Sequence, residues 1–126
     1  MKMVIAAMAT ALAIATATDT LAQAAIEQTL ASMSPLQVEQ TGETLTVVLP
    51  QDRITHPIYT TAIGGVCMAL FSDDAALDGI REMRVLNRHA KYGMVAEGGK
   101  ELCTELNALP VGKEKANALM IVTHTF

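Results

Sequence analysis

The chain has 126 residues and a formal net charge of −4, with 9 Lys and Arg side chains against 13 Asp and Glu. This mild acidity argues against a general nucleic-acid-binding protein, whose domain would be basic. Trp is absent and Phe and Tyr number two each, so aliphatic and Met side chains must supply most of any core.

The first 24 residues are typical of a secretory signal peptide. Lys2 gives a positive start, residues 3–17 carry no charge, and Ala22-Gln23-Ala24 places small side chains at the two positions that a signal peptidase recognises. The uncharged run is short for a bilayer span, which needs about 20 apolar residues. We expect cleavage after Ala24, with Ala17 as an alternative exit and an uncleaved N-terminal anchor as a less favoured hypothesis. The mature protein is then one small exported domain, residues 25–126, periplasmic or secreted.

Cys67 and Cys103 are the two cysteines of the chain. An even number of Cys in an exported chain predicts a disulfide, because an oxidising compartment does not keep thiols reduced. Neither residue belongs to a Cys-x-x-Cys pair, and neither lies within a few residues of a His. Two buried free thiols, or metal or redox chemistry, are the alternatives.

The first half of the expected domain contains a hairpin. Residues 25–32 are compatible with a short helix, which ends before Pro35. Residues 36–40 and 44–49 flank a Gly-containing turn, and the second run is rich in Thr, Val and Leu, which predicts a β-hairpin. The alternation places two sets of side chains on one face of their strands: Leu36, Val38 and Gln40 in the first, and Leu45, Val47 and Leu49 in the second.

A helix is predicted over residues 57–71. Pro57 suits the first turn, where its missing N–H costs nothing. The apolar residues recur at helical spacing: Ile58, Ala62, Ile63, Val66, Cys67, Leu70 and Phe71. The opposite side is also uncharged, which indicates a helix buried over most of its surface. Because residues 54–71 carry no charge, a membrane segment is an alternative, which His56, Pro57 and the paired glycines disfavour.

The second half repeats the pattern. Residues 82–86 and 91–97 predict a second hairpin with Met83 and Val85 facing inward, although Leu86 falls on the outward parity. Residues 100–109 predict an amphipathic helix with Cys103 toward the core. Residues 113–118 suit one helical turn and residues 119–125 a last strand. The sequence thus predicts an α+β domain of order β-β-α-β-β-α-β: an antiparallel sheet of two β-hairpins plus a C-terminal strand, with two helices packed on one face.

The chain offers little chemistry. His56, His89 and His124 lie in three separate segments, and no two have the spacing of a metal-binding pair, so we expect solvated or singly bonded histidines. The acidic residues Asp73, Asp74 and Asp78 lack the alternating ligands of a Ca²⁺ loop. No nucleophile motif or phosphate-binding loop occurs in the sequence. We therefore predict no metal, no cofactor and no catalytic residue.

The second hairpin is basic in an otherwise acidic domain. Arg81, Arg84, Arg88 and Lys91 fall within eleven residues. They predict a docking surface for an anionic ligand, a lipid surface or an acidic partner. The alternative is a charged edge hairpin that is merely protected from aggregation.

The sequence therefore favours a small exported, non-enzymatic domain that binds or assembles with a protein or a small anionic ligand, and not with nucleic acid. One alternative is a small exported enzyme or enzyme inhibitor that acts through Arg84, Arg88, His89 and Tyr92 of the second hairpin. Another is a membrane-associated protein that uses residues 54–71 as a span.

Overall fold

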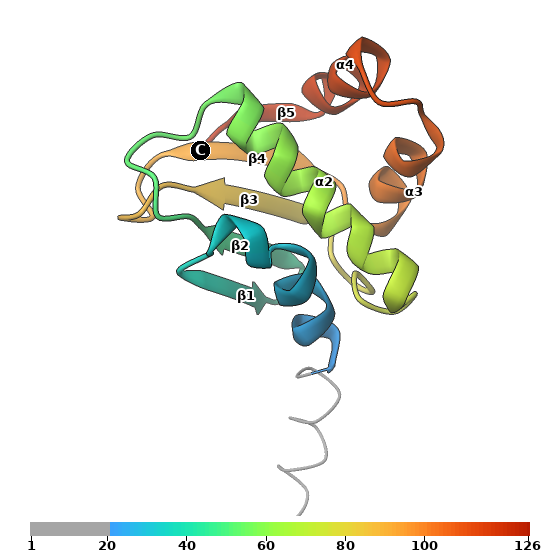
Figure 1. Cartoon of the computed structure of the whole chain (residues 1–126), viewed down its shortest axis with the longest axis horizontal. Coiled ribbons are helices and arrows are strands. Elements are labelled where there is room, and N and C mark those ends of the chain that lie inside the picture. Colours follow the sequence, from blue (N-terminus) through green and yellow to red (C-terminus); the bar gives the residue numbers. More distant parts are fainter. Residues whose placement is uncertain (1–20) are drawn as a thin grey trace, which may run out of the picture.

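The computed structural model describes residues 21–126, which form a five-stranded sheet with helices packed against it (Figure 1). The predicted signal peptide therefore lies mostly outside the described residues. Its predicted exit, Ala22-Gln23-Ala24, belongs to a helical segment over residues 21–29. Ile26 within this segment and Leu30 directly after it are buried, and the Gln23 side-chain amide donates a 2.7 Å hydrogen bond to the carbonyl of Val38.

The sheet is mixed, and its strands follow one another in chain order. They are β1 (Gln37–Thr41), β2 (Thr44–Val48), β3 (Glu82–Leu86), β4 (Gly93–Glu97) and β5 (Thr123–Thr125). Both predicted hairpins are confirmed, but β2 and β3 run parallel, so the prediction of an entirely antiparallel sheet was wrong. The reason is that a helix carries the chain from the end of β2 back to the start of β3, and such a crossover joins parallel neighbours.

Within residues 21–126 the chain forms four helices: the segment over residues 21–29, α2 (His56–Ser72), α3 (Lys100–Ala108) and α4 (Lys113–Ile121). A short 3-10 turn, η1 (Ala31–Met33), follows the first of them. The predicted helices over residues 57–71 and 100–109 are confirmed to within one residue. The Thr55 hydroxyl caps α2 by accepting from the amide of Ile58, and Pro57 stands in the first turn. None of these helices is long and apolar enough to cross a membrane.

The C-terminal prediction was partly wrong. Residues 119–121, which we expected in the last strand, belong to α4, and β5 is limited to three residues. The stretch from Lys113 onward is rich in Lys, Glu, Ala, Leu and Met, which are strong helix formers, and the local preference therefore extends through the apolar end. Leu119 is the buried residue of this helix, and its carbonyl accepts from the amide of Val122, where the helix ends.

Alternation failed to predict burial on the outer face of the sheet. Val48 and Leu86 have outward parity, yet they are 4% and 3% exposed. They are register partners across β2 and β3 and lie outside the main core, as does the buried Val95 of β4. Directly before β1, by contrast, Leu36 is 60% exposed although it shares its parity with the buried Val38. The sheet therefore has a small apolar row on its outer face besides the core beneath the helices.

The main core lies between the inner face of the sheet and α2, which crosses it in Figure 1. The helix contributes six buried residues: Tyr59, Ala62, Ile63, Val66, Cys67 and Ala69. Cys67 forms a disulfide with Cys103 of α3 across a Cα–Cα distance of 4.9 Å, so the predicted bond is present. The Asn107 side chain adds a hydrogen bond of 3.1 Å to the Cys67 carbonyl. The disulfide thus fixes α3 to the helix that covers the sheet.

We predict that the double variant Cys67→Ala/Cys103→Ala is destabilised by about 4 kcal/mol, because the bond closes a loop between residues 36 apart and so restricts the unfolded chain. Urea unfolding of the unsubstituted protein and of the variant measures the difference. Reduction of the unsubstituted protein should give a loss of similar size. Two thiols that react with a thiol reagent in the denatured, unreduced protein would contradict the bond.

Candidate functional site

Four basic side chains gather at one end of the sheet, beyond the ends of β2 and β3. Arg88, His89 and Lys91 lie in the turn between β3 and β4, and Arg53 lies in the loop between β2 and α2; all four are exposed. The two segments are in contact, because the amide of Arg88 donates to the carbonyl of Gln51 at 2.9 Å. We call these four residues the basic turn site.

A buried amide side chain holds the basic turn site together. Asn87 is 4% exposed and is the one buried polar residue among those described. Its Oδ1 accepts from the backbone amides of Lys91 and Tyr92 at 3.0 and 3.2 Å, and its Nδ2 donates to the carbonyl of Asp52 at 3.0 Å. Because three of its hydrogen bonds are made inside the protein, Asn87 fixes the turn to the loop that carries Arg53.

The structure separates the four basic residues that the sequence grouped. Arg81 lies before β3 and pairs with Glu43 at 3.0 Å, whereas Arg88 and Lys91 lie beyond the other end of the strand. Arg88 approaches Asp52, with 3.3 Å between Nη1 and Oδ1. Arg84 lies in the middle of β3 on the outer face.

Arg53 is the residue of this site that sequence analysis missed. It stands 35 positions before Arg88, and nothing in its local pattern marks it. The parallel pairing of β2 and β3 is the signal that would have found it, because residues that follow two parallel neighbours meet at the same edge of the sheet.

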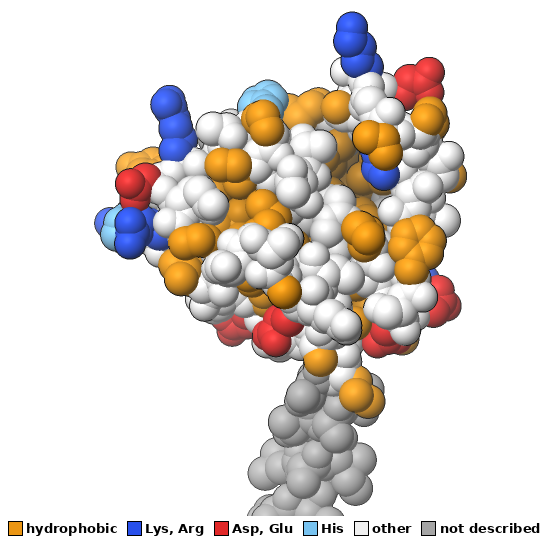
Figure 2. Space-filling view, in the orientation of Figure 1, with side chains coloured by type: hydrophobic (Ala, Val, Ile, Leu, Met, Phe, Trp, Pro, Cys, Tyr) orange, Lys and Arg blue, Asp and Glu red, His pale blue; other side chains and the backbone are white. Residues whose placement is uncertain are grey.

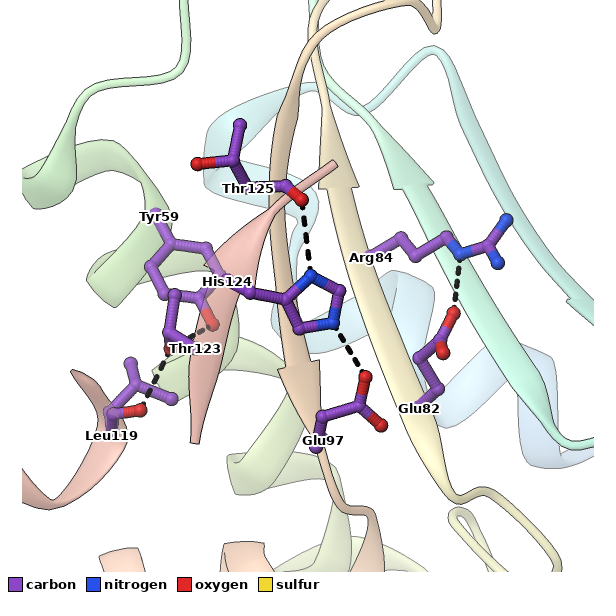
Figure 3. Close-up of polar contacts among 8 residues, drawn as sticks. All are labelled: Tyr59, Glu82, Arg84, Glu97, Leu119, Thr123, His124 and Thr125. Atoms are coloured by element: carbon purple, nitrogen blue, oxygen red, sulfur yellow. Dashed lines mark hydrogen bonds and ion pairs between the residues drawn. The ribbon is translucent and has the colours of Figure 1, made fainter. Parts of the chain in front are cut away.

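The outer face of β3, β4 and β5 carries a second group of charges (Figure 3). Glu82 and Glu97 are directly opposite each other on β3 and β4, an unfavourable like-charge pair. Each carboxylate has its own cation: Arg84 Nε is 2.5 Å from Glu82, and His124 Nε2 is 2.6 Å from Glu97. The two cations therefore reduce the repulsion between the two glutamates. We call these four residues the outer-face quartet.

The C-terminal residue packs beside this quartet. The guanidinium carbon of Arg84 is 5.3 Å from the centre of the Phe126 ring, within the range of a cation–π contact. Val95, the register partner of both Arg84 and His124, is 2% exposed between them. Phe126 itself remains 45% exposed. Strand β5 is thus attached to the sheet through side chains as well as through its short ladder.

Protonation of His124 is favoured in the folded protein. Its Nε2 faces the Glu97 carboxylate, and its Nδ1 lies 3.1 Å from the carbonyl oxygen of Thr125. Because each ring nitrogen faces an oxygen acceptor, both hydrogen bonds form only when both nitrogens carry hydrogen. The hydrogen bond to Glu97, then the Thr125 carbonyl and the charges of Glu97 and Glu82, raise the pKa of His124 above 6.5. The quartet therefore loses one positive charge when the pH rises through the raised pKa of His124.

The inner side of β5 is held by a hydroxyl relay (Figure 3). The Thr123 hydroxyl donates to the carbonyl of Leu119 at 2.8 Å, and the Tyr59 hydroxyl lies 2.7 Å from the same Thr123 oxygen. Because the Thr123 hydrogen is already used, Tyr59 must be the donor. Burial raises the pKa of the Tyr59 hydroxyl, which keeps it protonated. The relay joins α2 to α4 and β5 and leaves His124 on the outer face.

The residues that would serve an enzyme or inhibitor do not share one described cavity. Tyr92, which is 71% exposed, lines an open depression with Arg53, Gly93 and Thr125, whereas Arg84, Arg88 and His89 are not among its lining residues. Among residues 21–126 no group of three or more His, Cys, Asp or Glu is placed to hold a metal ion. Comparison with known proteins found no matching family model, no matching curated protein and no matching solved structure.

We predict that Asn87→Ala destabilises the protein by about 2 kcal/mol, because three part-buried hydrogen bonds, to the amides of Lys91 and Tyr92 and to the carbonyl of Asp52, are lost together. Asn87→Asp loses the hydrogen bond to the Asp52 carbonyl and sets a carboxylate against it, but it keeps the acceptor for the two turn amides. Because two of the three hydrogen bonds remain, it should cost less than Asn87→Ala. Urea unfolding measures both, and hydrogen exchange of residues 88–92 should be faster in each. An Asn87→Ala protein as stable as the unsubstituted chain would exclude this role.

We predict that His124 titrates above its ordinary value of 6.5 and that Glu97→Gln lowers its pKa. Since the folded-state pKa is raised, the contribution of His124 to stability is fully present below about pH 6.5 and is lost as the pH rises through the folded-state pKa. NMR titration of the imidazole follows the pKa, and melting temperatures follow the stability. Glu114→Gln on α4 is the matched control. An unchanged His124 pKa in Glu97→Gln would contradict the pairing.

Proposed function

We propose that this chain is an exported, non-catalytic binding or assembly domain whose basic turn site docks an acidic segment of a partner protein. The observation that carries the proposal is the convergence of four basic side chains from two loops in a chain of net charge −4. A local basic cluster on an acidic protein attracts and orients an anionic partner.

Preorganisation supports this proposal. Asn87 and the hydrogen bond from Arg88 to Gln51 hold the two segments in one arrangement before any partner binds. A surface that is already ordered loses less conformational entropy on binding. Export of the chain rests on its N-terminal pattern, and the disulfide fits an oxidising compartment.

A protein partner is favoured over a small anion by the shape and composition of the site. The four basic groups lie together on an exposed turn and an exposed loop, and they do not line a deep cavity. Tyr92 stands beside them with 71% of its surface exposed, and the Arg and Tyr combination is enriched in the residues that dominate protein–protein binding energy. An acidic segment could contact several of these groups at once.

Binding of a hexaglutamate peptide to the exported protein is the test. We expect amide shifts in residues 51–53 and 87–92, with an affinity that falls as salt is added because the contacts are exposed and screened. The triple variant Arg53→Glu/Arg88→Glu/Lys91→Glu should weaken binding at least tenfold. The same triple variant should fail to capture an acidic partner from the native compartment.

The control is Arg81→Glu/Lys113→Glu/Lys115→Glu, which makes the same change in net charge at positions away from the site. This control variant should bind the peptide nearly as well as the unsubstituted chain. Both triple variants should have the melting temperature of the unsubstituted chain. If the two variants weakened peptide binding equally, net charge alone would explain the loss, and the basic turn site would not be the binding site. Shifts of the same amides by phosphatidylglycerol vesicles or inorganic phosphate at lower concentration than by the peptide would overturn the choice of a protein partner.

A further inference from the structure

The helical segment over residues 21–29 is part of the fold from its first turn, at the β1 edge of the sheet (Figure 1). Strand β1 is paired on one side only, by β2, and the bond from the Gln23 side-chain amide to the Val38 carbonyl covers part of its open edge. Ala25 and Ile26 belong to the main core, where they are 9% and 3% exposed. The sheet therefore uses residues that precede the predicted exit after Ala24.

Cleavage after Ala24 would remove the first turn of this segment. In an α-helix each amide donates to the carbonyl four residues earlier, so the amides of Ala25 and Ile26 would lose their acceptors on residues 21 and 22. The new α-amino group would be charged, and it would stand on a residue that is 9% exposed. A buried charge without a partner is strongly unfavourable. The fold is thus poorly suited to a chain that starts at Ala25.

Residues 22 and 23 also cover part of the core. Ala22 and Gln23 line a depression of about 290 Å³ together with Leu45 of β2 and Ala76, and these last two are each 2% exposed. Without residues 22 and 23, both apolar side chains would gain contact with water. Leu21, in contrast, is 70% exposed, so the described chain enters the fold from its surface. Figure 2 shows hydrophobic side chains exposed where the described residues begin.

The sequence has a second exit that leaves this segment intact. Ala15-Thr16-Ala17 also places small side chains at the two positions that a signal peptidase recognises. A leader of residues 1–17 is within the usual length of about 15–30 residues, and the uncharged run over residues 3–14 is within the usual length of about 7–15 for its apolar core. Local pattern alone therefore allows either exit.

We propose that the signal peptide is removed after Ala17, so that the mature protein starts at Thr18 and keeps the whole helical segment. This inference rests on export, which is part of the proposed function, and it uses the fold to choose between the two exits. Only the exit after Ala17 preserves the Gln23 hydrogen bond to Val38 and leaves the buried Ala25 without a charge.

Intact-mass measurement of the exported protein tests the exit. The full chain is produced with its own leader in a Gram-negative bacterium, and we expect the periplasmic protein to have the mass of residues 18–126. Ala17→Gln should prevent cleavage after residue 17, because this position requires a small side chain. The matched variant Ala24→Gln should leave the start at Thr18, and the fold should accept it because Ala24 is exposed.

A second pair of variants of the full chain reports on the retained segment. Gln23→Ala should lower the melting temperature of the exported protein by about 4 °C, because one hydrogen bond is lost. Gln28→Ala, at an exposed position of the same segment, is the control and should not lower it. If the mature chain started at Ala25, the exported Gln23→Ala protein would equal the unsubstituted one in both mass and melting temperature.

The outcomes separate the exit from the proposed function. An exported protein with the mass of residues 25–126 would overturn the exit after Ala17, and so would a Gln23→Ala protein that melts with the unsubstituted one. A chain of full-length mass in the membrane would overturn this exit but not export, whereas a full-length chain that stays in the cytoplasm would overturn both. Hexaglutamate binding by the same purified protein reports on the basic turn site wherever the chain begins.

Discussion

The parallel pairing of β2 and β3 is the constraint on which the rest of the structure depends. The hairpins β1–β2 and β3–β4 could each form from local sequence, but α2 must cross the sheet to set them side by side in the same direction. The ladder even continues past the strands, where the amide of Leu49 donates to the carbonyl of Leu86. The loop after β2 and the turn after β3 consequently leave the sheet at the same edge. The basic turn site exists because of this topology.

Helix α2 is held near both of its ends by the C-terminal half of the chain. Near its start, Tyr59 donates to Thr123, which joins the helix to β5. Near its end, the disulfide from Cys67 and the hydrogen bond from Asn107 join it to α3. These contacts link residues 36 or more positions apart, so they restrict the chain far more than a local contact would. They keep the crossover helix in place over the two parallel strands.

Local sequence patterns predicted most of the helices and strands, because the tendency of a segment to form a helix or a strand is set by the residues of that segment. The strands around Met83 and Val85 follow from alternation, and α2 follows from Pro57 and its apolar spacing. The parallel register could not be predicted in this way, since a hairpin pattern is the same whichever direction its neighbour runs. The burial of Val48 and Leu86 likewise depends on each being the register partner of the other across two strands that are distant in sequence.

The site was predicted only in part, for the same reason. Arg88 and Lys91 were identified because they lie close in sequence, and sequence proximity is a good guide within a turn. Arg81 was grouped with them although a whole strand separates their positions. Arg53 could be added only with knowledge of the sheet topology. The role of Asn87 had no sequence signal, because an Asn in a turn is ordinary until its side chain is seen to reach the carbonyl of Asp52 in another loop.

The environment of each cation decides which of them could serve a partner. Arg84 is bonded to Glu82 and stacked near Phe126, so recruiting it would leave Glu82 facing Glu97 with less compensation. Arg88 meets Asp52 at 3.3 Å with both side chains at least half exposed, and such surface pairs are worth about 0–1 kcal/mol. An incoming carboxylate can therefore replace Asp52 at little cost. Arg53 and Lys91 make no ion pair within residues 21–126. The basic turn site, more than the outer-face quartet, thus has charge to offer to an anionic partner.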